Sequence, residues 1–105
     1  MGLTIEQTVI GAKIRIAVAG EVDLYTSPDL RSAIIKAVPA AAEGLEVELS
    51  GVQYMDSSGV ATLVEGFKSA RENSKSFVLL TPSQSVMKVL ELARLDAVFE
   101  IERAP

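Results

Sequence analysis

The sequence predicts a single α/β domain, residues 1–105, built on one small mixed β-sheet with helices packed on it. Strand-like stretches alternate with helix-like stretches of about ten to fifteen residues, which is typical of βαβ units. The first two strand-like stretches are separated by only two residues, which indicates an antiparallel hairpin. Hydrophobic residues make up 49% of the chain, enough for a buried core. We therefore expect an antiparallel entry, then right-handed crossovers and a largely parallel sheet.

The first half of the chain contains three predicted strands and one helix. Leu3 to Ile10 is the first strand, Gly11-Ala12 is the turn, and Lys13 to Gly20 is the second strand. Thr26 to Asp29 predicts a helix start, with a hydroxyl N-cap, a proline in the first turn and an acid beside the positive end of the dipole. Apolar residues then follow helical spacing until Pro39, where we expect the helix to end. The third strand is predicted at Leu45 to Leu49.

The second half repeats the alternation. After residues 54–59, YMDSSG, apolar spacing predicts a helix that ends near Asn73-Ser74. Phe77 to Leu80 is a short apolar strand of the kind buried in parallel sheets. Thr81-Pro82 repeats the cap-then-proline start and predicts a third helix. Val98 to Ile101 is the last predicted strand.

Composition excludes several functional classes. Net charge is −4, and the ten Lys and Arg residues are spread from Lys13 to Arg103, so no basic stripe exists for nucleic acid or an anionic membrane. Lys36 and Pro39 interrupt the longest apolar run, and no signal-peptide pattern is present, so we expect a cytoplasmic protein without direct membrane insertion. The chain has no Cys and no His, which removes thiolate catalysis, the usual zinc sites and the commonest general base. We expect no metal and no cofactor.

Tyr54 to Gly59 is the leading candidate site, because it joins the third predicted strand to the second helix. At this edge of an open α/β sheet, backbone N–H groups and the helix dipole point toward ligands and partners. A structural interpretation carries equal weight: Asp56 or Ser57 simply caps the helix and contributes about 1 kcal/mol. Gly59 favours the functional interpretation, since glycine in a helix costs up to about 1 kcal/mol relative to alanine and leaves the neighbouring hydroxyls unshielded.

Catalysis at this site is not expected. A nucleophilic serine needs a base, and in the absence of histidine only a lysine or a carboxylate could serve. YMDSSG also lacks the glycines two residues before and after the serine that mark a nucleophile elbow. A small enzyme that uses Asp23 and Asp56 ranks below a binding module, because no paired-acid geometry follows from their spacing. The hydroxyls are therefore more simply explained as groups that another protein modifies or binds.

The order of elements and three sequence segments resemble the STAS domain of bacterial anti-sigma factor antagonists. The segments are Gly20 to Asp23 at the end of the second strand, Met55 to Gly59 before the second helix, and Ser85 to Asp96 followed by Val98-Phe99. The resemblance covers nearly the whole chain, and Asp-Ser-Ser-Gly in this context is a fairly specific motif. It implies a STAS-like fold across residues 1–105.

The resemblance also implies a function for individual residues. In that family, a partner that is both serine kinase and anti-sigma factor phosphorylates the serine after the aspartate, which is Ser57 here. Ser58 and Gly59 complete the motif, and Asp23 and Asp56 are expected in the partner-binding surface.

The implied function is therefore a phosphorylation-switched anti-sigma factor antagonist. Its unphosphorylated form would sequester the anti-sigma factor and free a sigma factor. The alternative within the same fold is the cytoplasmic STAS subunit of an ABC-type lipid transporter. The sequence leaves open which sigma factor is involved, whether a phosphatase resets Ser57, and the oligomeric state.

Overall fold

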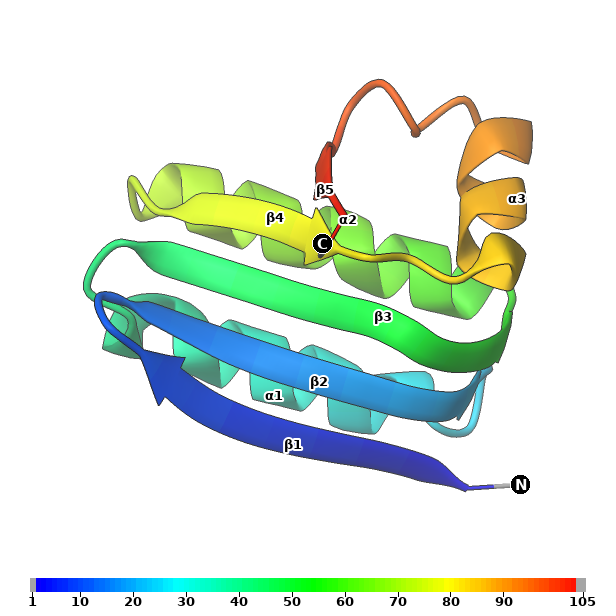
Figure 1. Ribbon diagram of the computed structural model, residues 1–105, viewed down its shortest axis with the longest axis horizontal. Coiled ribbons are helices and arrows are strands. Elements are labelled where there is room, and N and C mark those ends of the chain that lie inside the picture. Colours follow the sequence, from blue (N-terminus) through cyan, green and yellow to red (C-terminus); the bar gives the residue numbers. More distant parts are fainter. Residues whose placement is uncertain (1, 104–105) are drawn as a thin grey trace.

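The computed structural model describes residues 2–103 and contains one five-stranded sheet in the order β1-β2-β3-β4-β5 (Figure 1). β1 is antiparallel to β2, and every other neighbouring pair is parallel, so the predicted α/β class with an antiparallel entry is confirmed. The elements are β1 (Leu3–Ile10), β2 (Lys13–Val22), α1 (Ser27–Ala40), β3 (Gly44–Met55), α2 (Ser57–Glu72), β4 (Ser76–Leu80), α3 (Gln84–Leu92) and β5 (Glu100–Glu102).

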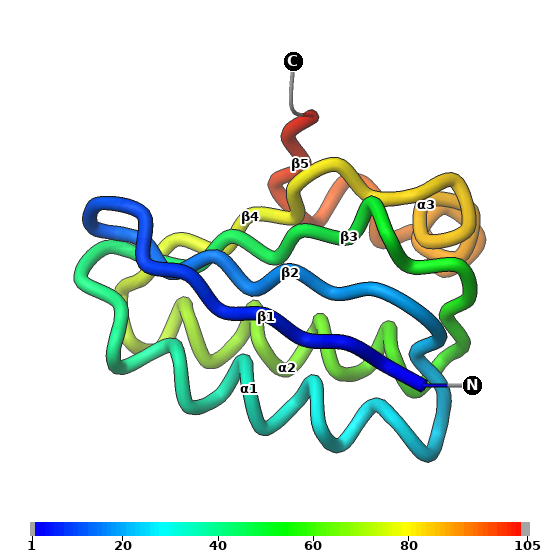
Figure 2. The backbone as a smooth tube through the Cα atoms, turned by 60° about the horizontal axis from the view of Figure 1, so that its bottom comes forward, coloured from blue at the N-terminus to red at the C-terminus, as the bar shows by residue number. Residues whose placement is uncertain are grey.

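The core lies between one face of the sheet and the two longest helices. α1 and α2 lie side by side on this face (Figure 2), and each buries its apolar stripe against the strands. Full burial of a Leu, Ile or Val side chain contributes roughly 1.5–3 kcal/mol, so this layer is the main source of stability. Its largest fully buried side chains include Ile16, Leu30, Ile34, Leu45, Leu49, Leu63 and Leu79.

β3 is much longer than the predicted strand at Leu45 to Leu49. It continues past the predicted end at Leu49, because β2 continues beside it as far as Val22. The pairing is interrupted by register shifts, one of them next to Gly51, and Met55 is buried at the end of the strand. Only Asp56 therefore separates β3 from α2.

The start of α1 differs from the prediction. The hydroxyl of Thr26 does not cap the helix; it donates to the carbonyl of Glu21 at 2.8 Å and accepts from the backbone N–H of Asp23 at 2.9 Å. Pro39 lies inside the helix, which ends one residue later, and the N–H of Ala41 still donates to the carbonyl of Ala37 at 3.0 Å.

The start of α3 also differs from the prediction. Ser83, rather than Thr81, caps α3 by accepting from the N–H of Val86 at 3.2 Å. The N–H of Ser83 donates to the carbonyl of Leu49 at 3.2 Å, so α3 packs against β3 beyond the end of β4 (Figure 1). β5 begins at Glu100 rather than at Val98.

Within residues 2–103, no helix combines the length and the hydropathy that a membrane span requires. In the same part of the chain, no three His, Cys, Asp or Glu side chains are grouped closely enough to hold a metal ion.

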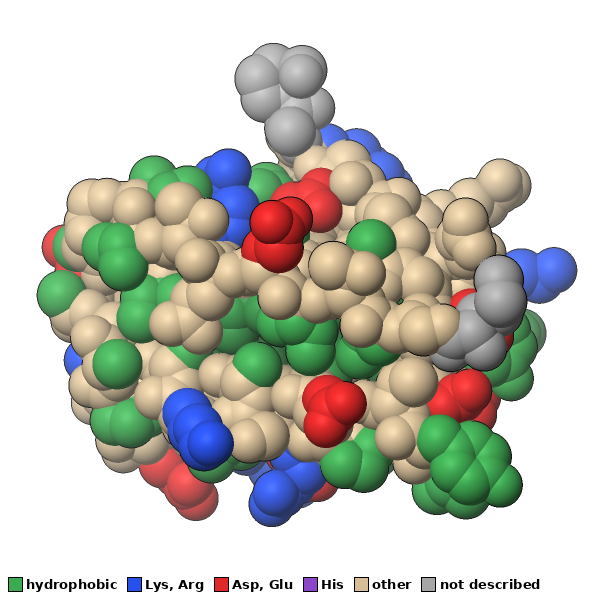
Figure 3. Space-filling model, turned by 90° about the horizontal axis from the view of Figure 1, so that it is seen from below, with side chains coloured by type: hydrophobic (Ala, Val, Ile, Leu, Met, Phe, Trp, Pro, Cys, Tyr) green, Lys and Arg blue, Asp and Glu red, His purple; other side chains and the backbone are tan. Residues whose placement is uncertain are grey.

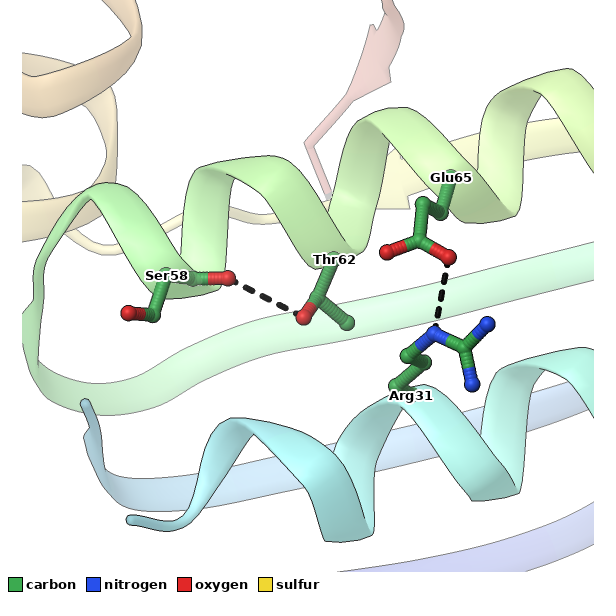
Figure 4. Close-up of polar contacts among 4 residues, drawn as sticks. All are labelled: Arg31, Ser58, Thr62 and Glu65. Carbon is green, nitrogen blue, oxygen red and sulfur yellow. Dashed lines mark hydrogen bonds and ion pairs between the residues drawn. The ribbon is translucent and has the colours of Figure 1, made fainter. Parts of the chain in front are cut away.

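The contact between α1 and α2 leaves little room for added side-chain volume. Arg31 of α1 and Glu65 of α2 form an exposed ion pair, with Nε and Oε2 2.7 Å apart (Figure 4). Gly66, the residue after Glu65 in α2, lies so close to the core that a Cβ would approach Ile34 Cγ2 to 2.7 Å and Phe77 Cε1 to 2.9 Å. Glycine at this position allows α2 to approach the sheet and α1 together.

We expect Gly66→Val to reduce the free energy of unfolding by about 1–3 kcal/mol, because the added side chain overpacks a full core. Urea unfolding would show this as a lower midpoint at an unchanged slope. Ala61→Val is the matched control, since Ala61 is exposed on the same helix and should lose less than about 0.7 kcal/mol through helix propensity alone. Equal losses in the two variants would contradict the packing explanation.

Candidate functional site

Two loops lie side by side at the carboxyl ends of β2 and β3. Val22 and Met55 are partners in the parallel register, so the two strands end at the same level of the sheet. The N–H of Asp56 then donates to the carbonyl of Val22 at 3.1 Å and ties the second loop to the first. The loop after β2 begins with Asp23, so the structure brings the two predicted acidic segments together at one end of the molecule (Figure 1).

Asp56 caps α2. Its Oδ1 accepts from the N–H of Ser58 at 2.9 Å, and its carbonyl accepts from the N–H groups of Gly59 and Val60 at 3.0 and 3.2 Å. Of the two caps that the sequence allowed, Asp56 is correct and Ser57 is not. The capping carboxylate places Ser57 at the first helical position.

Ser57 is exposed, and its hydroxyl makes no hydrogen bond with any residue between 2 and 103. A serine that serves only structure at a helix start normally bonds a backbone N–H. Asp56 already performs that role here, so the hydroxyl of Ser57 is free to meet another molecule.

Ser58 and Gly59 face the protein more than Ser57 does. Ser58 is half-buried, and its carbonyl accepts from the hydroxyl of Thr62 at 3.0 Å within the first turns of α2 (Figure 4). Gly59 is buried, and a Cβ there would lie 2.6 Å from Met55 Cγ and 2.8 Å from Val22 Cγ1. The sequence suggested that this glycine unshields the hydroxyls; the structure shows that it lets α2 pack on the ends of β2 and β3.

Asp23 is held in one conformation by its own loop. Its Oδ1 accepts from the N–H of Tyr25 at 2.9 Å and from the N–H of Thr26 at 3.0 Å. The Thr26 N–H is the main reason why the pKa of Asp23 is lowered; partial desolvation opposes it, and the Tyr25 N–H and the Thr26 hydroxyl add to it. The site therefore presents a fixed negative charge.

Three exposed apolar side chains extend the site. Leu24 is 66% exposed and Tyr25 is 87% exposed in the loop after β2, and Tyr54 is 49% exposed beside the end of β3. Hydrophobic and acidic side chains gather at this end of the molecule in Figure 3. Leu24 was not among the predicted site residues. The signal that could have revealed it is a leucine in an otherwise polar strand-to-helix turn. We call Asp23, Leu24, Tyr25, Tyr54, Asp56 and Ser57 the loop surface.

The loop surface carries chemical groups that are suited to recognition by another protein. Neither Val22–Ser27 nor Met55–Gly59 contains a basic residue that could activate the hydroxyl of Ser57. The surface combines two carboxylates, exposed aromatic and aliphatic groups, and one free hydroxyl. Aromatic anchors beside fixed charges are typical of protein–protein interfaces.

Asp56→Ala should lower the free energy of unfolding by about 1 kcal/mol, because the N–H of Ser58 loses its partner. Asp56→Asn should change stability much less, since asparagine caps helices about as well as aspartate. Chemical denaturation of the three proteins checks both values. If Asn and Ala were equally destabilising, the charge rather than the cap would be the source of the effect.

The carboxyl group of Asp23 should titrate below 3.8, its ordinary value, in an NMR titration of the folded protein. Because the folded pKa is lowered, the stabilisation is present above pH 3.8 and is lost as the pH falls through the folded value. The variant Thr26→Val keeps both backbone N–H donors and loses only the hydroxyl. The pKa of Asp23 should therefore rise only part of the way toward 3.8. A wild-type midpoint at or above 3.8 would contradict this account.

Comparison with known proteins places the chain in a family. Residues 7–101 match the family model described as "Mlab, STAS domain". The chain is 37% identical over 91 residues to the anti-sigma-B factor antagonist of Listeria monocytogenes, an alignment that covers 85% of this chain and 78% of the relative.

Solved structures show the same fold. An anti-sigma factor antagonist from Mycobacterium paratuberculosis matches with a TM-score of 0.86 and 23% identity, over 96% of this chain and 86% of that chain. SpoIIAA of Bacillus in its unphosphorylated form matches with a TM-score of 0.81 and 22% identity, over 97% and 89% of the two chains. Its phosphorylated form matches with a TM-score of 0.75 and 23% identity, over 99% and 92%. The chain therefore belongs to the STAS domain family, and its relatives include anti-sigma factor antagonists.

Proposed function

We propose that this chain is an anti-sigma factor antagonist that binds an anti-sigma factor through the loop surface and is released from it by phosphorylation of Ser57. The observation that carries the proposal is the free, exposed hydroxyl of Ser57 between the loops of Asp23 and Asp56. The relative at 37% identity is an anti-sigma-B factor antagonist, and SpoIIAA is known in unphosphorylated and phosphorylated forms. The proposed partner is both anti-sigma factor and serine kinase.

Phosphorylation at this position is compatible with the fold. A phosphate on Ser57 adds roughly −1.5 to −2 charges at neutral pH. Ser57 is the first residue of α2, where the positive end of the helix dipole stabilises a negative charge. The side chain is exposed, so the phosphate remains hydrated and displaces no core residue. The modification therefore leaves the domain folded.

The effect of the phosphate falls on the interface instead. Neither loop of the site carries Lys or Arg, so the new charge finds no cation within these segments. Asp23 and Asp56 add negative charge of their own beside it. A partner surface whose cations already face Asp23 and Asp56, and which receives a neutral hydroxyl at Ser57, would have to desolvate a dianion that it has no further cation to pair, which is strongly unfavourable. Binding is lost while the free protein stays intact.

The apolar members of the loop surface supply the affinity in this proposal. Leu24 and Tyr25 are the most exposed apolar side chains of the loop surface, and burial of such side chains provides most of the energy of many interfaces. Asp23 and Asp56 would then select a partner with a basic rim, because complementary charge sets specificity and association rate.

The test is a pull-down from extract of the source organism with ATP present. Wild-type protein and the variants Ser57→Ala and Ser57→Asp serve as baits, and partners and intact bait mass are determined by mass spectrometry. We expect one added phosphate on wild type only, and a kinase-like partner that is retained by Ser57→Ala and lost from Ser57→Asp.

Ser58→Ala is the matched control, because it removes the neighbouring hydroxyl and leaves Ser57 and the Asp56 cap in place. It should still acquire the phosphate. A phosphate that disappears in Ser58→Ala and persists in Ser57→Ala would overturn the assignment. Recovery of a membrane permease and its ATPase with all baits, without phosphate, would identify a lipid-transporter subunit instead.

A further inference from the structure

A concave surface, which we call the groove, lies away from the loop surface, between the later turns of α2 and the segment that joins α3 to β5. Its volume is about 350 Å³. It begins near Val64 and extends to Glu72, so its centre near Phe67 lies roughly 15 Å along α2 from Ser57. Any ligand bound here is therefore separate from the proposed phosphorylation site.

The floor of this groove is apolar and preorganised. The rings of Phe67 and Phe99 meet edge to face with centroids 5.6 Å apart, and Phe99 is buried. Val64 and Leu95 line the walls, and Val98 is 48% exposed at the edge. The edge-to-face packing holds the two rings in place, so the apolar floor stays exposed to water. An apolar occupant would cover this surface and so lower the free energy of the system.

The mouth of the groove carries an excess of positive charge. Lys68 and Arg71 line it together with one acid, Glu72. Neither cation forms an ion pair with any residue between 2 and 103. The guanidinium of Arg71 lies 5.7 Å from the centroid of the Phe67 ring, which holds a donor group directly above the apolar floor.

We propose that this groove binds a small amphiphile with one carboxylate head and a short apolar tail, such as a medium-chain fatty acid. The tail would lie on the Phe67–Phe99 floor, and the carboxylate would meet Arg71 and Lys68. The volume is near the lower end of small-molecule pockets, which span roughly 300–1,000 Å³.

The experiment is a titration of ¹⁵N-labelled protein with decanoate, decan-1-ol or decyltrimethylammonium, each kept below its aggregation concentration. Decanoate should shift the amide signals of the second half of α2 and of residues 95–99. Decanol, which has the same tail without the charge, should bind roughly tenfold more weakly. The cationic amphiphile should bind more weakly still, because its head is repelled by Lys68 and Arg71.

Two variants separate the tail contact from the head contact. Val98→Glu places a carboxylate at the exposed edge of the floor, so it should fold normally and abolish decanoate binding. Arg71→Gln should weaken decanoate roughly threefold and reduce the preference for decanoate over decanol, since Lys68 still faces the head group. Lys36→Gln is the matched control: Lys36 is an exposed residue of α1, so this change should leave decanoate binding unchanged. Spectra without ligand show that each variant is folded.

Several outcomes would overturn the proposal. These are no saturable shift with decanoate, equal affinity for decanoate and decanol, unchanged binding in Val98→Glu, or shifts concentrated at Leu24 and Tyr25. The last result would mean that the amphiphile adsorbs to the exposed loop surface rather than entering the groove.

Discussion

The long parallel pairing of β2 with β3 is the constraint on which the rest of the structure depends. It buries the central strands, positions α1 and α2 on one face, and ends both strands at the same level with Val22 beside Met55. The hydrogen bond from Asp56 to Val22 then fixes the start of α2 relative to the loop of Asp23. Without this register, the acidic loops and the free serine hydroxyl would not form one surface.

Structure and recognition are divided among adjacent residues of the Asp-Ser-Ser-Gly segment. Asp56 satisfies the helix start, and Gly59 allows close packing on Met55 and Val22. These two residues take up the structural demands, which leaves Ser57 without an internal role among the described residues. The most exposed hydroxyl of the motif is therefore also the one whose chemical modification disturbs the fold least.

Most of the fold could be predicted from local patterns, because alternation and helical spacing reflect which face of each element is buried. The errors occurred where tertiary contacts override local signals. The third strand was predicted to end at Leu49, yet its pairing with β2 continues to Met55. Thr26 looked like a helix cap, but its hydroxyl is taken by Glu21 and Asp23. In the candidate site, the motif made Ser57 the candidate residue, which stays a prediction, whereas the exposure of Leu24 depends on how the chain leaves the sheet.

The order of the strands in the sheet has a consequence for how the chain folds. Each strand pairs only with the strands that precede and follow it in sequence, so no pairing in the sheet skips over another strand. The β1–β2 hairpin closes over two residues, and each later strand is added after a single helical crossover. The partners in each parallel pair are nevertheless far apart along the chain, as Lys13 and Gly44 are, so each helical crossover must close before its strands can pair, which costs loop-closure entropy. We therefore expect the β1–β2 hairpin to form faster than the parallel pairs that follow it.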